Sequence, residues 1–107
     1  MFSINGKDIA ISKGDTGIIT ITLTGEVPDN NTIALVTVRE NVNTCNVVWE
    51  KRLQVNNGVI IIDLTSEETD IPAHTYVWDF RLLYSDGGVY TPFQPAKYQI
   101  YEVVGDV

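Results

Sequence analysis

Apolar and polar residues alternate with a period of two along most of the chain, and this alternation restricts the chain to β-structure. The clearest example is residues 75–84, in which every second position holds a large apolar side chain: Tyr76, Trp78, Phe80, Leu82 and Tyr84. Because successive side chains of a strand point to opposite faces, these five share one face of a sheet. Residues 17–24 and 33–39 divide between two faces in the same way, and these segments and residues 59–64 are rich in β-branched residues.

Turn-forming residues separate these segments at intervals of about 8–12 residues, a spacing typical of a β-sandwich or barrel. The pair Asn57-Gly58 is the strongest hairpin signal, and it predicts that the strands on either side of it pair with each other. One helical turn follows the second of these strands, with Thr65 or Ser66 as its cap. Pro72 limits it to about one turn, because proline breaks a helix interior.

The strand count is seven or eight, and we predict one immunoglobulin-like antiparallel β-sandwich over residues 1–107. Tyr76 supports this fold independently of the number of strands, because it lies at the start of a predicted strand that follows a corner. In a tyrosine corner the hydroxyl bonds back to upstream backbone. Pro92 and Pro95 interrupt the last strand region and predict an edge, a bend or a switch between sheets.

The charge balance excludes some partners. With 7 basic and 14 acidic residues the chain has a net charge of -7, which repels a nucleic-acid backbone. No apolar run approaches the ~20 residues of a membrane span, so we expect no membrane insertion. The first twelve residues lack the pattern of a signal peptide. The single cysteine, Cys45, suits a reducing compartment.

Candidate chemistry is sparse. Asp15-Thr16-Gly17 matches the catalytic triplet of aspartic proteases, which would act here as a dimer sharing a proton between two aspartates. The triplet follows a polar Lys-Gly pair, however, and we favour a turn that opens the next strand. His74 has no second histidine or suitably spaced cysteine to form a zinc or nucleophile site with it. We therefore predict no enzymatic activity and no cofactor.

Carboxylates and amides recur at turns, where they could bind calcium. They are Asp29, Asn30, Asn31, Asn56, Asn57, Glu67, Glu68, Asp70 and Asp86. No segment has the spacing of an EF-hand loop, and the same residue types favour turns for conformational reasons. We therefore predict no metal site, and calcium binding by these loops stays open.

Aromatic residues outside the alternating core face are the candidates for an interface. We select Trp49, Tyr90 and Phe93, since large aromatic side chains anchor protein contacts well. Phe93 lies between two prolines, where regular strand pairing is broken. The same three rings could instead form a stacking platform for carbohydrate or a cell surface.

The order of short motifs resembles the immunoglobulin-like domain at the N-terminus of phage baseplate upper proteins and related tail proteins. The matching segments are Gly14-Asp15-Thr16, Thr37-Val38-Arg39, the strand bearing Lys51, Gly58-Val59-Ile60-Ile61-Ile62, Tyr76-Val77-Trp78-Asp79-Phe80-Arg81, and Val89, Thr91, Pro95 and Tyr98. The resemblance covers nearly the whole chain. His74 stands where the family usually has glycine, and Trp78 replaces its second aromatic residue.

The resemblance implies a non-catalytic structural or interaction module of a phage or prophage tail or baseplate. Its partners would be other tail or baseplate proteins, with further copies of the same chain as an additional partner. The resemblance also implies that the protein is assembled into a virion in the cytoplasm of the bacterial host. Family members often continue into a fibre-binding or coiled-coil region, which this sequence lacks, so we expect a connector or accessory role.

Overall fold

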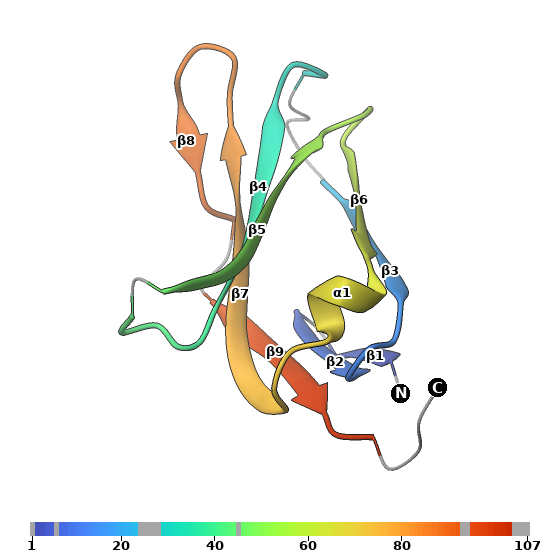
Figure 1. Ribbon diagram of the computed structural model, residues 1–107. Coiled ribbons are helices and arrows are strands. Elements are labelled where there is room, and N and C mark those ends of the chain that lie inside the picture. The colour runs from blue at the N-terminus through green and yellow to red at the C-terminus, as the bar shows by residue number, and fades with distance from the viewer. Residues whose placement is uncertain (1, 6, 24–28, 45, 93–94, 104–107) are drawn as a thin grey trace.

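The computed structural model describes residues 2–5, 7–23, 29–44, 46–92 and 95–103. These residues form a mostly β-structure with two sheets that face each other (Figure 1). The strands are β1 (Phe2–Asn5), β2 (Asp8–Ser12), β3 (Gly17–Thr22), β4 (Ile33–Arg39), β5 (Val47–Gln54), β6 (Val59–Leu64), β7 (His74–Leu83), β8 (Val89–Tyr90) and β9 (Ala96–Tyr101), and the helix is α1 (Ser66–Thr69). The all-β sandwich predicted from the sequence is therefore confirmed.

The larger sheet has the strand order β1-β2-β9-β7-β4-β5, with β8 paired to β7, and the smaller sheet consists of β3 and β6. The order β9-β7-β4-β5 is that of strands G, F, C and C′ in a variable-type immunoglobulin sandwich. All pairs are antiparallel except β2 and β9, which run parallel. The sequence pattern did not predict this parallel pair, because alternation does not reveal strand direction.

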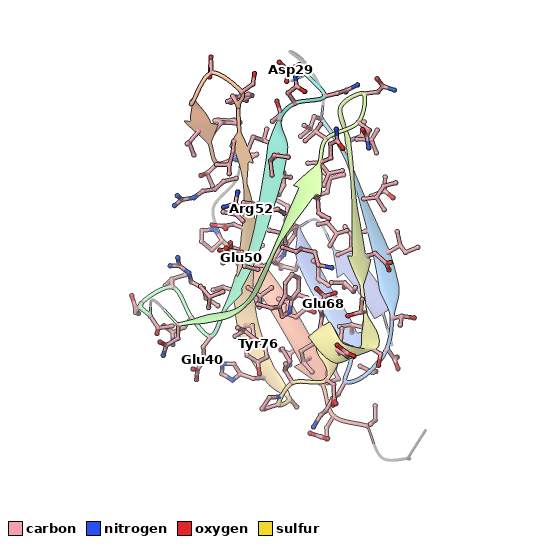
Figure 2. All side chains as sticks on the ribbon, turned by 45° about the horizontal axis from the view of Figure 1, so that its top comes forward. Asp29, Glu40, Glu50, Arg52, Glu68 and Tyr76 are labelled. Atoms are coloured by element: carbon pink, nitrogen blue, oxygen red, sulfur yellow. The ribbon has the colours of Figure 1, made fainter. Side chains whose placement is uncertain are left out.

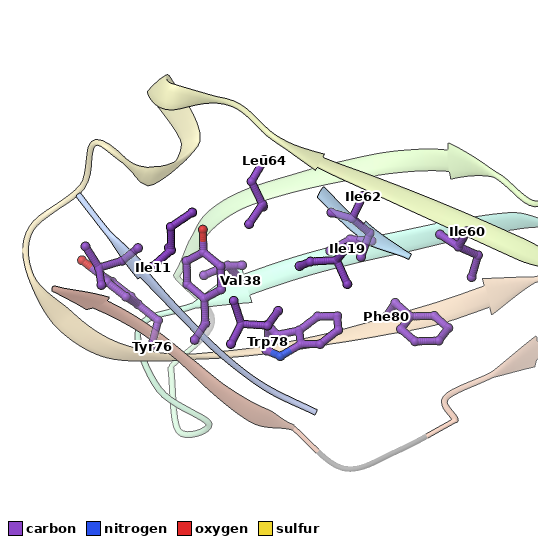
Figure 3. Packing of buried hydrophobic residues seen from close by; sticks show 14 of the residues in the cluster. Ile11, Ile19, Val38, Ile60, Ile62, Leu64, Tyr76, Trp78 and Phe80 are labelled. Atoms are coloured by element: carbon purple, nitrogen blue, oxygen red, sulfur yellow. The ribbon is translucent and has the colours of Figure 1, made fainter. Parts of the chain in front are cut away.

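The alternating apolar positions form the core between the sheets, as Figure 3 shows. From β7, the alternate residues Tyr76, Trp78, Phe80 and Leu82 are all buried. They face Ile19 of β3 and Ile60 and Ile62 of β6 across the sandwich (Figure 3). The fifth member of the predicted set, Tyr84, lies just beyond β7 and is half-buried against the same core.

The turn between β5 and β6 has the expected conformation but joins different sheets. Asn57 and Gly58 both have positive φ, 53° and 77°, as a type I′ turn requires. Beyond one bridge between Asn56 and Val59, however, β5 pairs with β4 and β6 pairs with β3. The predicted hairpin is therefore wrong. Its two strands diverge because β6 directs Ile60 and its other buried residues at the core from the opposite sheet.

The helical turn α1 has the predicted cap. Thr65 accepts a hydrogen bond from the Glu68 backbone N–H, and the Glu68 side chain accepts one from the Thr65 backbone N–H, which completes a capping box. The buried Thr69 hydroxyl donates to the Asp15 carbonyl oxygen at 2.6 Å. The Gly14 N–H donates to the Thr69 carbonyl oxygen. These bonds anchor the helical turn to the segment between β2 and β3.

The interrupted last strand runs along one edge of β7. The short β8 pairs with the end of β7, at Leu82 and Leu83, and β9 pairs with its beginning, from His74 to Trp78. Pro92 and Pro95 lie between these two strands, and β9 itself is covered by β2 on its other side. No helix in the described ranges is long and apolar enough to cross a membrane.

Candidate functional site

The outer face of the larger sheet carries charged residues in rows that cross its central strands. Each row contains one residue from β5, one from β4 and one from β7, because these strands pair in register. One row is Arg52, Leu35 and Arg81, and the next is Glu50, Thr37 and Asp79. Figure 2 shows Glu50 and Arg52 on the side of β5 that faces away from the smaller sheet.

A groove of about 270 Å³ lies on this face. It is lined by β4 and β7 residues of both rows, including Leu35, Thr37, Asp79 and Arg81, and by Arg39 one row further along. Its walls combine apolar, cationic and anionic side chains. A groove of mixed polarity on an exposed sheet face is suited to contact with another protein surface.

All three arginines of this acidic chain lie on this one face. Arg39, Arg52 and Arg81 are exposed. Within the part of the chain that the structure describes, none of them takes part in an ion pair or side-chain hydrogen bond. The carboxylate of Glu50 instead accepts a hydrogen bond of 3.4 Å from the Thr37 hydroxyl. The guanidinium groups therefore keep their hydrogen-bond donors available for a ligand.

The predicted interface residue Trp49 faces inward and is not part of an exposed aromatic surface. Alternation along β5 places it on the inner face, where its ring packs edge-on against Tyr98 at 5.9 Å between centroids. Its indole N–H is buried. Trp49 is thus a partly buried residue whose ring packs in the sandwich.

Tyr90 is 54% exposed, beside Val89 at 58%, on the short strand β8. It lies at the opposite side of the sheet from β5 and Trp49, since β7 and β4 lie between them. The structure therefore does not bring Trp49 and Tyr90 together. Phe93, the third predicted member, lies outside the described residues.

Lys51 joins the two sheets at their open side, next to Trp49. Its ammonium donates to the Asp63 carbonyl oxygen at 2.7 Å and to the Glu68 carboxylate at 2.8 Å, and it lies 5.6 Å from the Trp49 ring centroid. Burial raises the pKa of Glu68, but the bonds from Lys51 and Thr65 outweigh it and lower this pKa overall. Because β5 is an edge strand of the larger sheet, the inward-pointing charge of Lys51 also hinders pairing of β5 with a strand of another molecule.

Tyr98 and Trp49 bring two buried polar atoms close together. Neither the Tyr98 hydroxyl nor the Trp49 indole N–H completes a hydrogen bond to a described residue. Burial raises the pKa of Tyr98, the Glu68 carboxylate raises it further, and the neighbouring indole N–H opposes the shift. This hydroxyl therefore stays protonated, and the pair contributes to packing more than to polar bonding.

Tyr76 has the geometry of a tyrosine corner. Its hydroxyl donates to the Pro72 carbonyl oxygen at 2.6 Å, which is the backward hydrogen bond expected of a tyrosine in this setting. His74, in the position where glycine was expected, stacks edge-on against the Tyr76 ring at 4.9 Å. Burial raises the pKa of Tyr76, and the Glu40 carboxylate adds to this shift.

Asp15 lies in the turn that leads into β3. Its backbone N–H donates to the Ser12 carbonyl oxygen at 3.0 Å, and its own carbonyl oxygen accepts the bond from Thr69. Gly14 adopts a positive φ of 82° in the same turn. The triplet that begins with Asp15 is thus built as a structural turn.

The acidic loops make local hydrogen bonds. The carboxylate of Asp29 accepts bonds from the Asn31 N–H and the hydroxyls of Thr32 and Ser85. No group of three or more histidine, cysteine, aspartate or glutamate side chains that could hold a metal ion occurs in the described part of the chain. The bonds to the Asp29 carboxylate connect the loop before β4 with the loop after β7, which contains Ser85.

The sequence pattern did not predict the two charged rows on the outer face of the larger sheet. Arg81 and Asp79 could be assigned to the face opposite the aromatic residues from alternation alone. Their alignment with Arg52 and Glu50 depends on the pairing of β5, β4 and β7, which a single sequence does not encode in any local signal. Comparisons with protein-family models, with curated proteins and with solved structures each found no match for this chain.

Proposed function

We propose that this protein is a non-catalytic interaction module that binds another protein through the outer face of its larger sheet. The observation that carries the proposal is the group of three exposed arginines, Arg39, Arg52 and Arg81, that lie on this face without an ion-pair partner among the described residues. Arginine is enriched at protein interfaces, and its guanidinium binds carboxylates through two parallel hydrogen bonds.

The charge distribution supports this choice of face. The chain as a whole has a net charge of -7, yet its arginines gather here and not around the acidic helical turn α1. Leu35 and Thr37 between the charged side chains provide an apolar and uncharged centre. An interface with such a centre and a charged rim combines hydrophobic contact with electrostatic specificity.

We further propose that the partner belongs to a phage or prophage tail or baseplate, and that assembly takes place in the bacterial host cytoplasm. This part rests on the motif resemblance. Two of its segments meet on the proposed interface, since Thr37 of the first pairs with Asp79 of the second. Each segment also ends in an arginine of this face, Arg39 and Arg81.

The test combines particle composition with direct binding. We expect the protein in purified tail-bearing particles, and we expect its binding to the tail proteins there, further copies of this chain included, to weaken about tenfold in Arg81→Glu, as an exposed attraction becomes a repulsion. Lys13→Glu has the same change of charge away from this face and is the matched control. Equal binding by both variants, together with absence from particles, would contradict the proposal.

The non-catalytic part has its own test. If the purified protein hydrolysed peptides and Asp15→Asn abolished that hydrolysis, the non-catalytic part of the proposal would be refuted. We expect no hydrolysis in either form, because Asp15 lies in a turn whose backbone is held by hydrogen bonds from Thr69 and to Ser12.

A further inference from the structure

We infer that the partner that best fits the outer face is a second copy of this chain. The two copies would pack face to face about a twofold axis that runs across the strands, between the Arg52–Arg81 row and the Glu50–Asp79 row. This inference deepens the proposed function and rests on it. It follows from the order of charges on the face and from the symmetry that such an order permits.

The two rows have opposite charge and lie next to each other. On β5, Arg52 follows Glu50 by two positions, and on β7, Arg81 follows Asp79 by two positions. Residues two apart on a strand lie on the same face about 6.6 Å apart. Two cations therefore lie side by side in one row, and two carboxylates lie side by side in the next.

A twofold axis across the strands makes this order self-complementary. The rotation keeps each strand opposite its own copy and reverses the order of the rows. Arg81 then faces Asp79 of the second copy, and Arg52 faces Glu50 of the second copy. Symmetry doubles both pairs, because every contact in such an isologous interface occurs twice.

The other orientations fit the charges less well. An axis parallel to the strands would place Arg81 opposite Arg52 and Asp79 opposite Glu50, which brings like charges together. A uniformly acidic partner would attract the arginine row but repel the carboxylate row beside it. A face with one cationic row beside one anionic row thus favours a partner that carries the same two rows, and a second copy of the chain carries them.

The sheet geometry also fits such a contact. Two sheets that pack face to face lie about 10 Å apart, and the side chains at the centre of these rows, Leu35 and Thr37, are not charged. Arg39 lies one row beyond the carboxylates, so it would face Ile33 of the second copy and form no charge pair. Only two of the three arginines therefore take part in the predicted pairs.

The test is a charge-swap mixing experiment by sedimentation velocity over a range of protein concentrations. Salt of about 0.15 M is suitable, because its Debye length of about 8 Å screens the repulsion between two acidic chains more than the contact pairs. We expect a concentration-dependent dimer for the native chain. Arg81→Glu and Asp79→Arg should each weaken dimerisation about tenfold or more, since each brings like charges together twice.

An equimolar mixture of these two variants should dimerise again. In the mixed dimer, the glutamate introduced at position 81 of one chain faces the arginine introduced at position 79 of the other. The unchanged Asp79 of the first chain faces the unchanged Arg81 of the second, so both pairs are attractive. Recovery on mixing also shows that both variants are folded. Arg39→Glu is the control on the same face, and it should weaken dimerisation clearly less than Arg81→Glu.

Two outcomes would overturn the inference. One is a native chain that stays monomeric at every concentration, and the other is a mixture that does not recover. The proposed function is tested separately by binding to tail proteins. If Arg39→Glu and Arg81→Glu weaken that binding equally while the native chain is monomeric, the occupant of the face is an acidic partner protein, and only the inference of a second copy fails.

Discussion

The hydroxyl of Tyr76 offers a direct measure of what the corner before β7 contributes to stability. In Tyr76→Phe the ring keeps its edge-on contacts with His74 and Tyr98, and only the 2.6 Å hydrogen bond to the Pro72 carbonyl is lost. Tyr76 is 5% exposed, so water does not readily replace the hydroxyl. A hydrogen bond of this kind contributes about 1 kcal/mol to the free energy of unfolding.

For a chain of 107 residues, a loss of about 1 kcal/mol corresponds to a fall in Tm of roughly 4–5 °C. The assay is thermal and urea unfolding at neutral pH, followed by circular dichroism, with the slope of the urea transition compared between variants. Tyr90→Phe is the matched control, because Tyr90 is 54% exposed, and it should change the free energy of unfolding by less than about 0.3 kcal/mol. Equal stability of the two variants would refute the corner argument.

Two further changes test the seam between the sheets. Lys51→Met removes the cation that lowers the Glu68 pKa and should reduce the free energy of unfolding by about 1–2 kcal/mol at pH 7. Because a lowered carboxyl pKa stabilises the fold only above its usual range, the deficit should shrink as the pH falls below about 4; a deficit that is constant from pH 7 to pH 3 would contradict this. Tyr98→Phe removes a buried hydroxyl without a hydrogen bond and should leave stability unchanged or raise it by up to about 1 kcal/mol. Urea unfolding measures this change, and a loss as large as that of Tyr76→Phe would show that the hydroxyl has a partner.

Local patterns in the sequence predicted those parts of the fold that neighbouring residues decide. Alternation along residues 75–84 identified the buried face of β7, since the strand period is set by backbone geometry. The capping box at Thr65 and the positive φ of Asn57 and Gly58 depend on side chains within a few residues of one another. The hydrogen bond of Tyr76 spans only four residues.

Other expectations failed because they depended on contacts between distant segments. Asn57-Gly58 encoded a tight turn, but whether β6 paired with β5 or with β3 depended on which sheet could bury Ile60. The inward direction of the Trp49 side chain could not be predicted, because it depends on the register of β5. One position of register decides whether a residue faces the core or the solvent.

Local sequence patterns specify that this chain forms strands, which residues share a strand face, and where its tight turns and helical turn lie. These features follow from steric preferences and hydrogen bonds over a few residues. The parallel pairing of β2 with β9 and the row formed by Arg52, Leu35 and Arg81 arise from the way the strands assemble. Rows and sheet partners join residues far apart in the chain, and they are selected by the burial of the shared core, to which all strands contribute together.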